Sequence, residues 1–155
     1  MALDLIDKRI LELLQDDGGL SIADLAGKLG MTSPPCWRRV RRLRDEGYLQ
    51  RQIWLLNPEK LDLDVIIFAT VKLVTHDVTA TSRFRECVSA LPEVVECYIL
   101  LGGVDALLKI RVKSIKDYEA VFYERLSQLP AVREVVSSVV LSEVKYTTSL
   151  PLSRE

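Results

Sequence analysis

A short repeat in the C-terminal half is the strongest constraint on the fold of this chain. Leu91-Pro92-Glu93-Val94 recurs as Leu129-Pro130-Ala131-Val132, and each copy separates a helical pattern from an apolar run. Helical spacing predicts two helices, at 79–91 and 115–129. Apolar, β-branched runs predict four strands, at 65–74, 94–101, 106–112 and 135–146. The order βαββαβ predicts a ferredoxin-like domain, an antiparallel sheet with both helices on one face.

The first residues follow a helical pattern instead. Asp4 with Asp7, and Ser21 with Asp24, have the spacing of a helix N-cap followed by an acid three residues later. Each pair precedes apolar residues at helical spacing, so two helices are expected, the first ending near Asp16 and the second at Gly30.

A third helix is expected from Ser33, as N-cap, to about residue 46. Pro34 suits the first helical position, and Gly47 suits the end. Two helices joined by a tight turn that contains glycine, the second one basic and begun by proline, are typical of a helix-turn-helix.

Residues 48–56 alternate and are rich in apolar side chains, which predicts a small hairpin or wing before the turn at Asn57-Pro58. The expected architecture is therefore α+β. A winged helix-turn-helix over residues 1–60 is followed by the ferredoxin-like domain over residues 61–155.

Positive charge is concentrated on the third helix. The whole chain has a net charge of −1, but six arginines and two acids lie between Thr32 and Arg51, a balance of 6 − 2 = +4, so the rest sums to −5. A basic helix in an otherwise acidic protein indicates a nucleic-acid-binding surface, here for double-stranded DNA.

Rotation of about 100° per residue separates a core face of this helix, with Cys36, Val40 and Leu43, from an outward face and its flanks. The residues expected to contact DNA, including one in the wing, are Ser33, Pro34, Trp37, Arg38, Arg39, Arg41, Arg42 and Arg51.

Their expected roles differ. Arg38 lies in the N-terminal half of the helix, from which base edges are read, and is expected to contact guanine. Arg41 and Arg42 are expected to hold phosphates, and Ser33 to donate to one at the helix start. Arg39, near the core edge, is equally compatible with a structural role. The alternative for the whole face is a solvated surface paired with local acids.

The turn Gly102-Gly103-Val104-Asp105 is the one constellation in the second domain that resembles a ligand site. Paired glycines supply the positive φ of a tight hairpin and leave backbone N–H groups free. Asp105 is expected to pair with an amino group. The alternative is a hairpin in which Asp105 only hydrogen-bonds the turn.

Other patterns give no support to an enzyme. The chain has no phosphate-binding loop, glycine fingerprint or nucleophile elbow, and Ser142 and Lys145 lie on a predicted strand rather than in a catalytic pair. His76 is assigned no role. The three cysteines form no C-x-x-C pair, so reduced thiols are expected, with no metal and no cofactor.

The N-terminus is acidic, and no run approaches the roughly 18 apolar residues of a membrane span. We therefore expect no membrane partner and a cytoplasmic location.

Five segments carry a resemblance to a known family: Leu3-Asp4-x-x-Asp7-x-x-Ile10-Leu11, Pro35-Cys36-Trp37-Arg38-Arg39-Val40-Arg41-Arg42-Leu43, Leu55-Leu56-Asn57-Pro58, Gly102-x-x-Asp105-x-Leu107-Leu108 and Glu143-Val144-Lys145. With these, the chain resembles the Lrp/AsnC (leucine-responsive, feast/famine) family of bacterial and archaeal transcription regulators over essentially its whole length.

The resemblance implies dimers that assemble into tetramers or octamers, and amino-acid effectors bound between dimers. It places the effector site on Leu101, Gly102, Gly103, Asp105, Ser138 and Val139.

Three functions remain open at this point. The first is an effector-gated, sequence-specific regulator. The second is an architectural DNA-binding protein without effector control. The third is a metabolite-binding or enzymatic domain whose N-terminal helices only dimerise. Separately from these alternatives, dimerisation through the sheet is expected, because one face of so apolar a sheet needs a cover.

Overall fold

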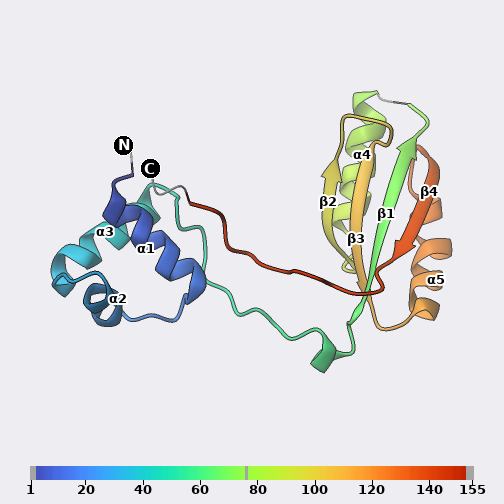
Figure 1. The fold of residues 1–155 in the computed structure, drawn as a ribbon. Coiled ribbons are helices and arrows are strands. Elements are labelled where there is room, and N and C mark those ends of the chain that lie inside the picture. Colours follow the sequence, from blue (N-terminus) through green and yellow to red (C-terminus); the bar gives the residue numbers. More distant parts are fainter. Residues whose placement is uncertain (1–2, 76, 153–155) are drawn as a thin grey trace. The chain divides into compact units, whose positions relative to one another are not determined.

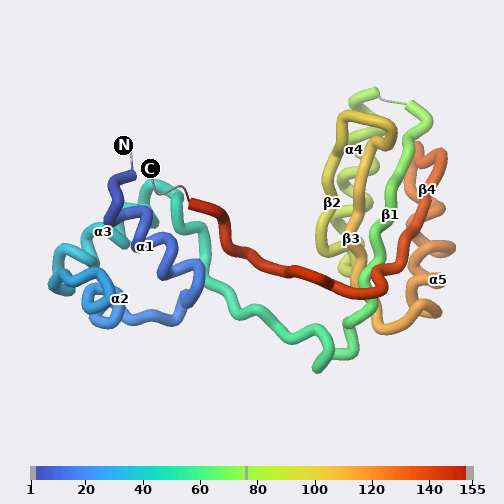
Figure 2. The backbone as a smooth tube through the Cα atoms, in the orientation of Figure 1, coloured from blue at the N-terminus to red at the C-terminus, as the bar shows by residue number. Residues whose placement is uncertain are grey.

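The computed structural model describes residues 3–75 and 77–152, which fold as two units (Figures 1 and 2). Within the described residues, one unit comprises residues 3–55 with 145–152, and the other comprises residues 56–75 with 77–144. The units divide after Leu55, and the C-terminal tail, which was expected in the second domain, groups with the first unit. The physical reason is that Leu152 packs against the helical core of the first unit.

The first unit contains three helices, α1 (Leu5–Asp16), α2 (Ile22–Lys28) and α3 (Ser33–Asp45). The two predicted capping pairs are confirmed. The Asp4 carboxylate accepts from the Asp7 N–H and the Asp7 carboxylate from the Asp4 N–H, while Ser21 accepts from the Asp24 N–H. The three helices enclose a small apolar core around Ile10, Leu25 and Leu43.

The start of α3 differs from the expected one. Thr32, not Ser33, is the N-cap, and its side chain makes no capping hydrogen bond. Ser33 is the first helical residue because Thr32 already has the extended backbone, with ψ of 156°. The tight turns before and after α3 use Gly30 (φ 64°) and Gly47 (φ 81°), where a side chain would be strained.

The predicted hairpin over residues 48–56 is wrong for the single chain. Within the described residues, no strand is formed between Tyr48 and Leu56, and the chain runs extended. Its middle, Gln50-Arg51-Gln52, has none of the glycine or asparagine that a tight hairpin turn demands. Ile53 to Leu56 are consequently exposed, Trp54 to 92%.

The second unit has the predicted βαββαβ order. Its elements are η1 (Glu59–Leu61), β1 (Val65–Leu73), α4 (Val78–Ser89), β2 (Val94–Ile99), β3 (Ala106–Val112), α5 (Ile115–Glu124), η2 (Leu126–Gln128) and β4 (Val132–Val139). The sheet order is β2-β3-β1-β4, and every neighbouring pair is antiparallel. The ferredoxin-like fold is confirmed.

The fourth strand begins and ends earlier than predicted. Ala131, with φ of 61°, turns the chain into β4, and pairing with β1 continues only to Val139 opposite Ile67. Val140 still donates to the Ile66 carbonyl at 2.9 Å, and no strand is formed from Leu141 to Leu152 in the described residues.

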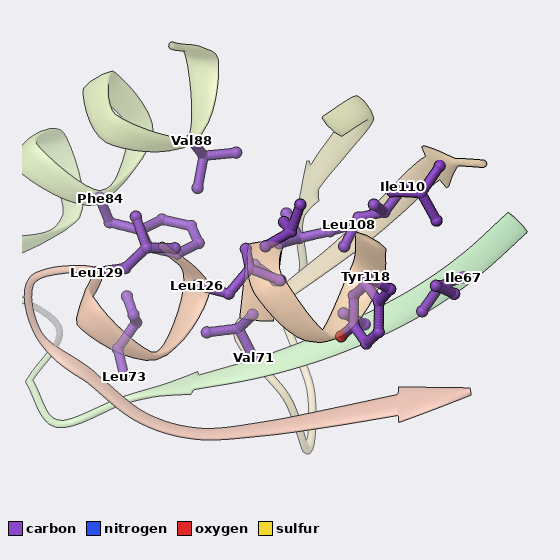
Figure 3. Close-up of a cluster of buried hydrophobic side chains, with 14 residues drawn as sticks. Ile67, Val71, Leu73, Phe84, Val88, Leu108, Ile110, Tyr118, Leu126 and Leu129 are labelled. Carbon is purple, nitrogen blue, oxygen red and sulfur yellow. The ribbon is translucent and has the colours of Figure 1, made fainter. Parts of the chain in front are cut away.

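One face of the sheet packs on α4 and α5. Alternate residues of β1, from Ile67 to Leu73, point into this core with Phe84 and Val88 of α4 and Tyr118 of α5 (Figure 3). The other face carries the intervening residues. In the described ranges, no helix is long and apolar enough to cross a membrane.

Candidate nucleic-acid interface and ligand turn

The inward face of α3 is the one that helical periodicity predicts. Cys36, Val40 and Leu43 are buried against α1 and α2. Burial also raises the pKa of the Cys36 thiol, which therefore stays protonated at neutral pH. With this face fixed, the opposite face of α3 points away from the core of its own unit.

The start of α3 forms a shallow, mainly apolar hollow on this outward side. Ser33, Pro34, Trp37 and Arg38 line it together with Ile22, and it encloses about 440 Å³. Trp37 and Arg38 are both exposed. The structure therefore brings together four residues predicted to contact DNA.

Arg41 extends this surface by one helical turn. Its guanidinium carbon lies 5.3 Å from the centre of the Trp37 ring, and Nε lies 3.7 Å from the Asp45 carboxylate. The side chain remains 65% exposed. Both contacts are weak at such an exposed position, so they leave the positive charge available to a phosphate.

Arg42 does not lie where the helical wheel places it. Its Nη2 donates to Oδ2 of Asp7, while Nη1 of Arg39 donates to Oδ1 of Asp7 (2.8 Å) and to Asp4 (2.6 Å). A wheel gives the direction of the Cα–Cβ bond, but a long arginine side chain can fold back toward a buried carboxylate. The placement of Arg42 on the outward face is thus corrected, and the structural alternative for Arg39 is favoured.

Arg51 is exposed, and no hairpin strands form around it in the described chain. It lies in the extended segment after α3, where it lines a cleft of about 590 Å³ with Leu49, Arg44 and residues at the end of α1 and the start of α2.

The turn at residues 102–105, the predicted ligand site, has other backbone angles than the expected hairpin. Gly102 and Gly103 lack positive φ, and open space surrounds the position of a Cβ at each. Asp105 instead fixes the turn: its Oδ2 accepts from the Leu73 N–H at 2.8 Å, and its own N–H donates to Val71. Leu101, at the tip, is fully exposed.

The six predicted effector residues do not meet within one chain. Asp105 lies at the end of β1, whereas Ser138 and Val139 pair with Phe68 and Ile67 near its start. Phe68 and Leu73 are separated by roughly 17 Å of strand at about 3.3 Å per residue.

Sequence reasoning missed two features of the first unit. Asp7 was expected only to cap α1, yet its side chain is 1% exposed and anchors two arginines of α3. A usable signal was its position one turn before Ile10 and Leu11, on the inward face. The return of the C-terminal tail to α1 carried no sequence signal.

No group of side chains suited to a metal ion occurs in residues 3–75 and 77–152. His76, to which no role was assigned, lies outside the described residues.

Both units match models of known domain families. Residues 3–50 match a model described as a winged helix-turn-helix DNA-binding domain, and residues 66–150 match one described as an Lrp/AsnC ligand binding domain.

Several proteins are similar over nearly the full chain. The DNA-binding transcriptional activator DecR of Escherichia coli is 39% identical, over 97% of this chain and 99% of the length of DecR. A proline dehydrogenase transcriptional activator of Rhizobium radiobacter is 41% identical, over 94% and 93%. A solved transcriptional regulator from Neisseria meningitidis, in complex with L-methionine, superposes with a TM-score of 0.93 at 33% identity, over 97% of both chains.

Proposed function

This chain belongs to the Lrp/AsnC family of transcription regulators, and we propose that α3 enters the major groove of specific DNA sites while the second domain senses an amino acid. The matched family and its relatives are regulators and not enzymes. The proposed place of action is the cytoplasm, where bacterial DNA lies.

One observation carries the DNA-binding proposal. Arg38 and Arg41 stand exposed beside Trp37 on the face of α3 that points away from its own core. In this arrangement Arg38, nearer the helix start, reads a base edge, whereas Arg41 holds a phosphate. Ser33 and Pro34 lie against the backbone of the duplex at the start of α3, and Arg51 supplies a contact further out.

The proposed assembly is a homodimer formed through the open face of the sheet, with further association into tetramers or octamers. Phe68, Thr70, Leu107, Tyr98 and Val136 lie on this face, as the strand register places them. Half of Tyr98 and of Val136 is exposed in one chain. A second copy would cover these exposed apolar side chains.

The proposed effector is an amino acid, as in the L-methionine complex of the Neisseria relative. Asp105 would pair with its amino group, and the open turn at Leu101, Gly102 and Gly103 would supply backbone N–H groups to its carboxylate. Because Ser138 and Val139 are remote from this turn in one chain, a site that uses all six residues requires two subunits.

Selection of genomic fragments by the purified protein, with and without each amino acid, tests this function. We expect retention of a distinct set of fragments at low salt, changed by one or a few amino acids. The same amino acids should stabilise the protein, by roughly 2.7 kcal/mol at about 100 times the dissociation constant.

The outcome also separates the alternatives. DNA binding with no response to any amino acid would favour an architectural protein. Retention of no fragment would contradict both DNA-binding functions.

A further inference from the structure

A buried carboxylate lies between the first and third helices. Asp7 is 1% exposed, and both of its oxygens are occupied: Oδ1 accepts from Arg39, while Oδ2 accepts from Arg42 and from the Asp4 N–H. A buried charge is tolerated only with such partners, so Asp7 holds the two guanidinium groups firmly.

The two arginines are not equivalent in this cluster. Arg39 also donates to Asp4, a half-exposed carboxylate at the start of α1. For Arg42, Asp7 is the one ion-pair partner in the part of the chain that the structure describes. Loss of the Asp7 charge would therefore release chiefly Arg42.

The cluster also changes the charge that α3 presents. The formal charges of the cluster sum to zero, because two carboxylates, Asp4 and Asp7, pair with two guanidinium groups, Arg39 and Arg42. Yet the sequence places four of the five arginines of α3 close together, at 38, 39, 41 and 42. Sequence-independent DNA affinity grows with each arginine that displaces a counterion from a phosphate. Arg39 and Arg42 are paired with carboxylates and therefore do not add to this attraction.

We propose that Asp7 limits sequence-independent DNA binding by holding Arg42 against α1. Asp7 is then a positioning residue that determines specificity, and this inference rests on the DNA-binding function proposed above. A freed Arg42 adds a phosphate contact most readily on a non-specific duplex, where no base contact fixes the position of α3. The outward face then keeps Arg38 and Arg41 as its reading and anchoring groups.

The salt dependence of binding to a non-specific duplex measures the effect in the full-length protein. For Asp7→Asn, the slope of log K against log salt should steepen by about 0.9, one phosphate contact. Non-specific affinity should rise about threefold or more at low salt, so the ratio of specific to non-specific affinity should fall. Asp7→Asn with Arg42→Gln should return the slope to the wild-type value.

Arg42→Gln alone provides a test that does not depend on the folding of Asp7→Asn, since Arg39 still compensates Asp7. It should leave the wild-type slope unchanged, whereas Arg41→Gln should reduce its magnitude by about 0.9. An unchanged slope in folded Asp7→Asn, or a reduced slope in Arg42→Gln, overturns the role of Asp7. If the wild-type protein binds no duplex at low salt, the DNA-binding function itself is overturned as well.

Discussion

The Gln15 side-chain amide, in α1, pairs with the backbone of Leu150 through two hydrogen bonds. Nε2 donates to the Leu150 carbonyl at 3.0 Å, and Oε1 accepts from the Leu150 N–H at 2.9 Å. Together with the packing of Leu152, this pair attaches the C-terminal tail to the helix-turn-helix unit. The tail is therefore part of the first unit although it follows the second in sequence.

Gln15→Ala should destabilise this unit. Loss of two partly exposed hydrogen bonds is expected to lower its free energy of unfolding by about 1–2 kcal/mol, measured by urea denaturation. Gln50→Ala, an exposed glutamine in the same unit, is the matched control and should cost less than about 0.5 kcal/mol. Equal effects of the two substitutions would contradict a role for the tail.

Arg38→Ala and Arg41→Ala should weaken DNA binding in different ways. The first should cost about 1–3 kcal/mol on the preferred site and relax the preference at one base, while the second should reduce the salt slope by about 1 on any sequence. Titrations against a panel of single-base variants distinguish the two. Arg83→Ala, at an exposed position of α4, is the control. Uniform losses for both α3 variants would refute the division of roles.

Asp105 is expected to have a structural and a ligand-binding role that two substitutions separate. Asp105→Ala leaves the Leu73 N–H without its acceptor and should cost about 1–3 kcal/mol of unfolding free energy. Asp105→Asn keeps an acceptor oxygen but loses the charge that would pair with an amino group. It should retain most of the stability yet lose the thermal shift caused by the effector amino acid. A full thermal shift in Asp105→Asn would exclude the charge pair.

Val136→Glu should disrupt the dimer. Val136 lies on the open face of the sheet opposite Thr70 and is 53% exposed in a single chain. An unpaired carboxylate buried between two sheets is expected to weaken dimerisation at least about 100-fold, which sedimentation across a concentration series would detect. Val78→Glu, at the start of α4, should leave assembly unchanged. A dimer unaffected by Val136→Glu would place the interface elsewhere.

Asp4 should make the first unit sensitive to acid. The Asp7 N–H and the Arg39 guanidinium both donate to its carboxylate and hold the pKa of Asp4 below its ordinary value. A lowered folded-state pKa contributes stability that is present above the unfolded pKa of about 3.9 and is lost as pH falls through the folded value.

Asp4→Asn keeps a good capping acceptor but removes this charge. The stability difference from wild type, measured by urea denaturation, should therefore be largest above about pH 5 and vanish in strong acid. A difference independent of pH would assign the effect of the substitution to capping alone.

The order of elements could be predicted from the sequence because each depends on local chemistry. Capping pairs such as Asp4 with Asp7, alternation along β1 and the repeated Leu-Pro turns report on residues close together in the chain. The inward face of α3 followed equally from the position of Cys36 and Leu43, since a helix fixes the direction of each Cβ.

What the sequence determined by itself was thus the fold class, the basic third helix and the face of that helix that is buried. Tertiary structure alone decided which arginines remain exposed, because Arg42 is turned back by a carboxylate 35 residues away on another helix. It likewise decided that the tail returns to Gln15 and that Ser138 lies far from Asp105. Such contacts join segments remote in sequence, and local periodicity carries no information about them.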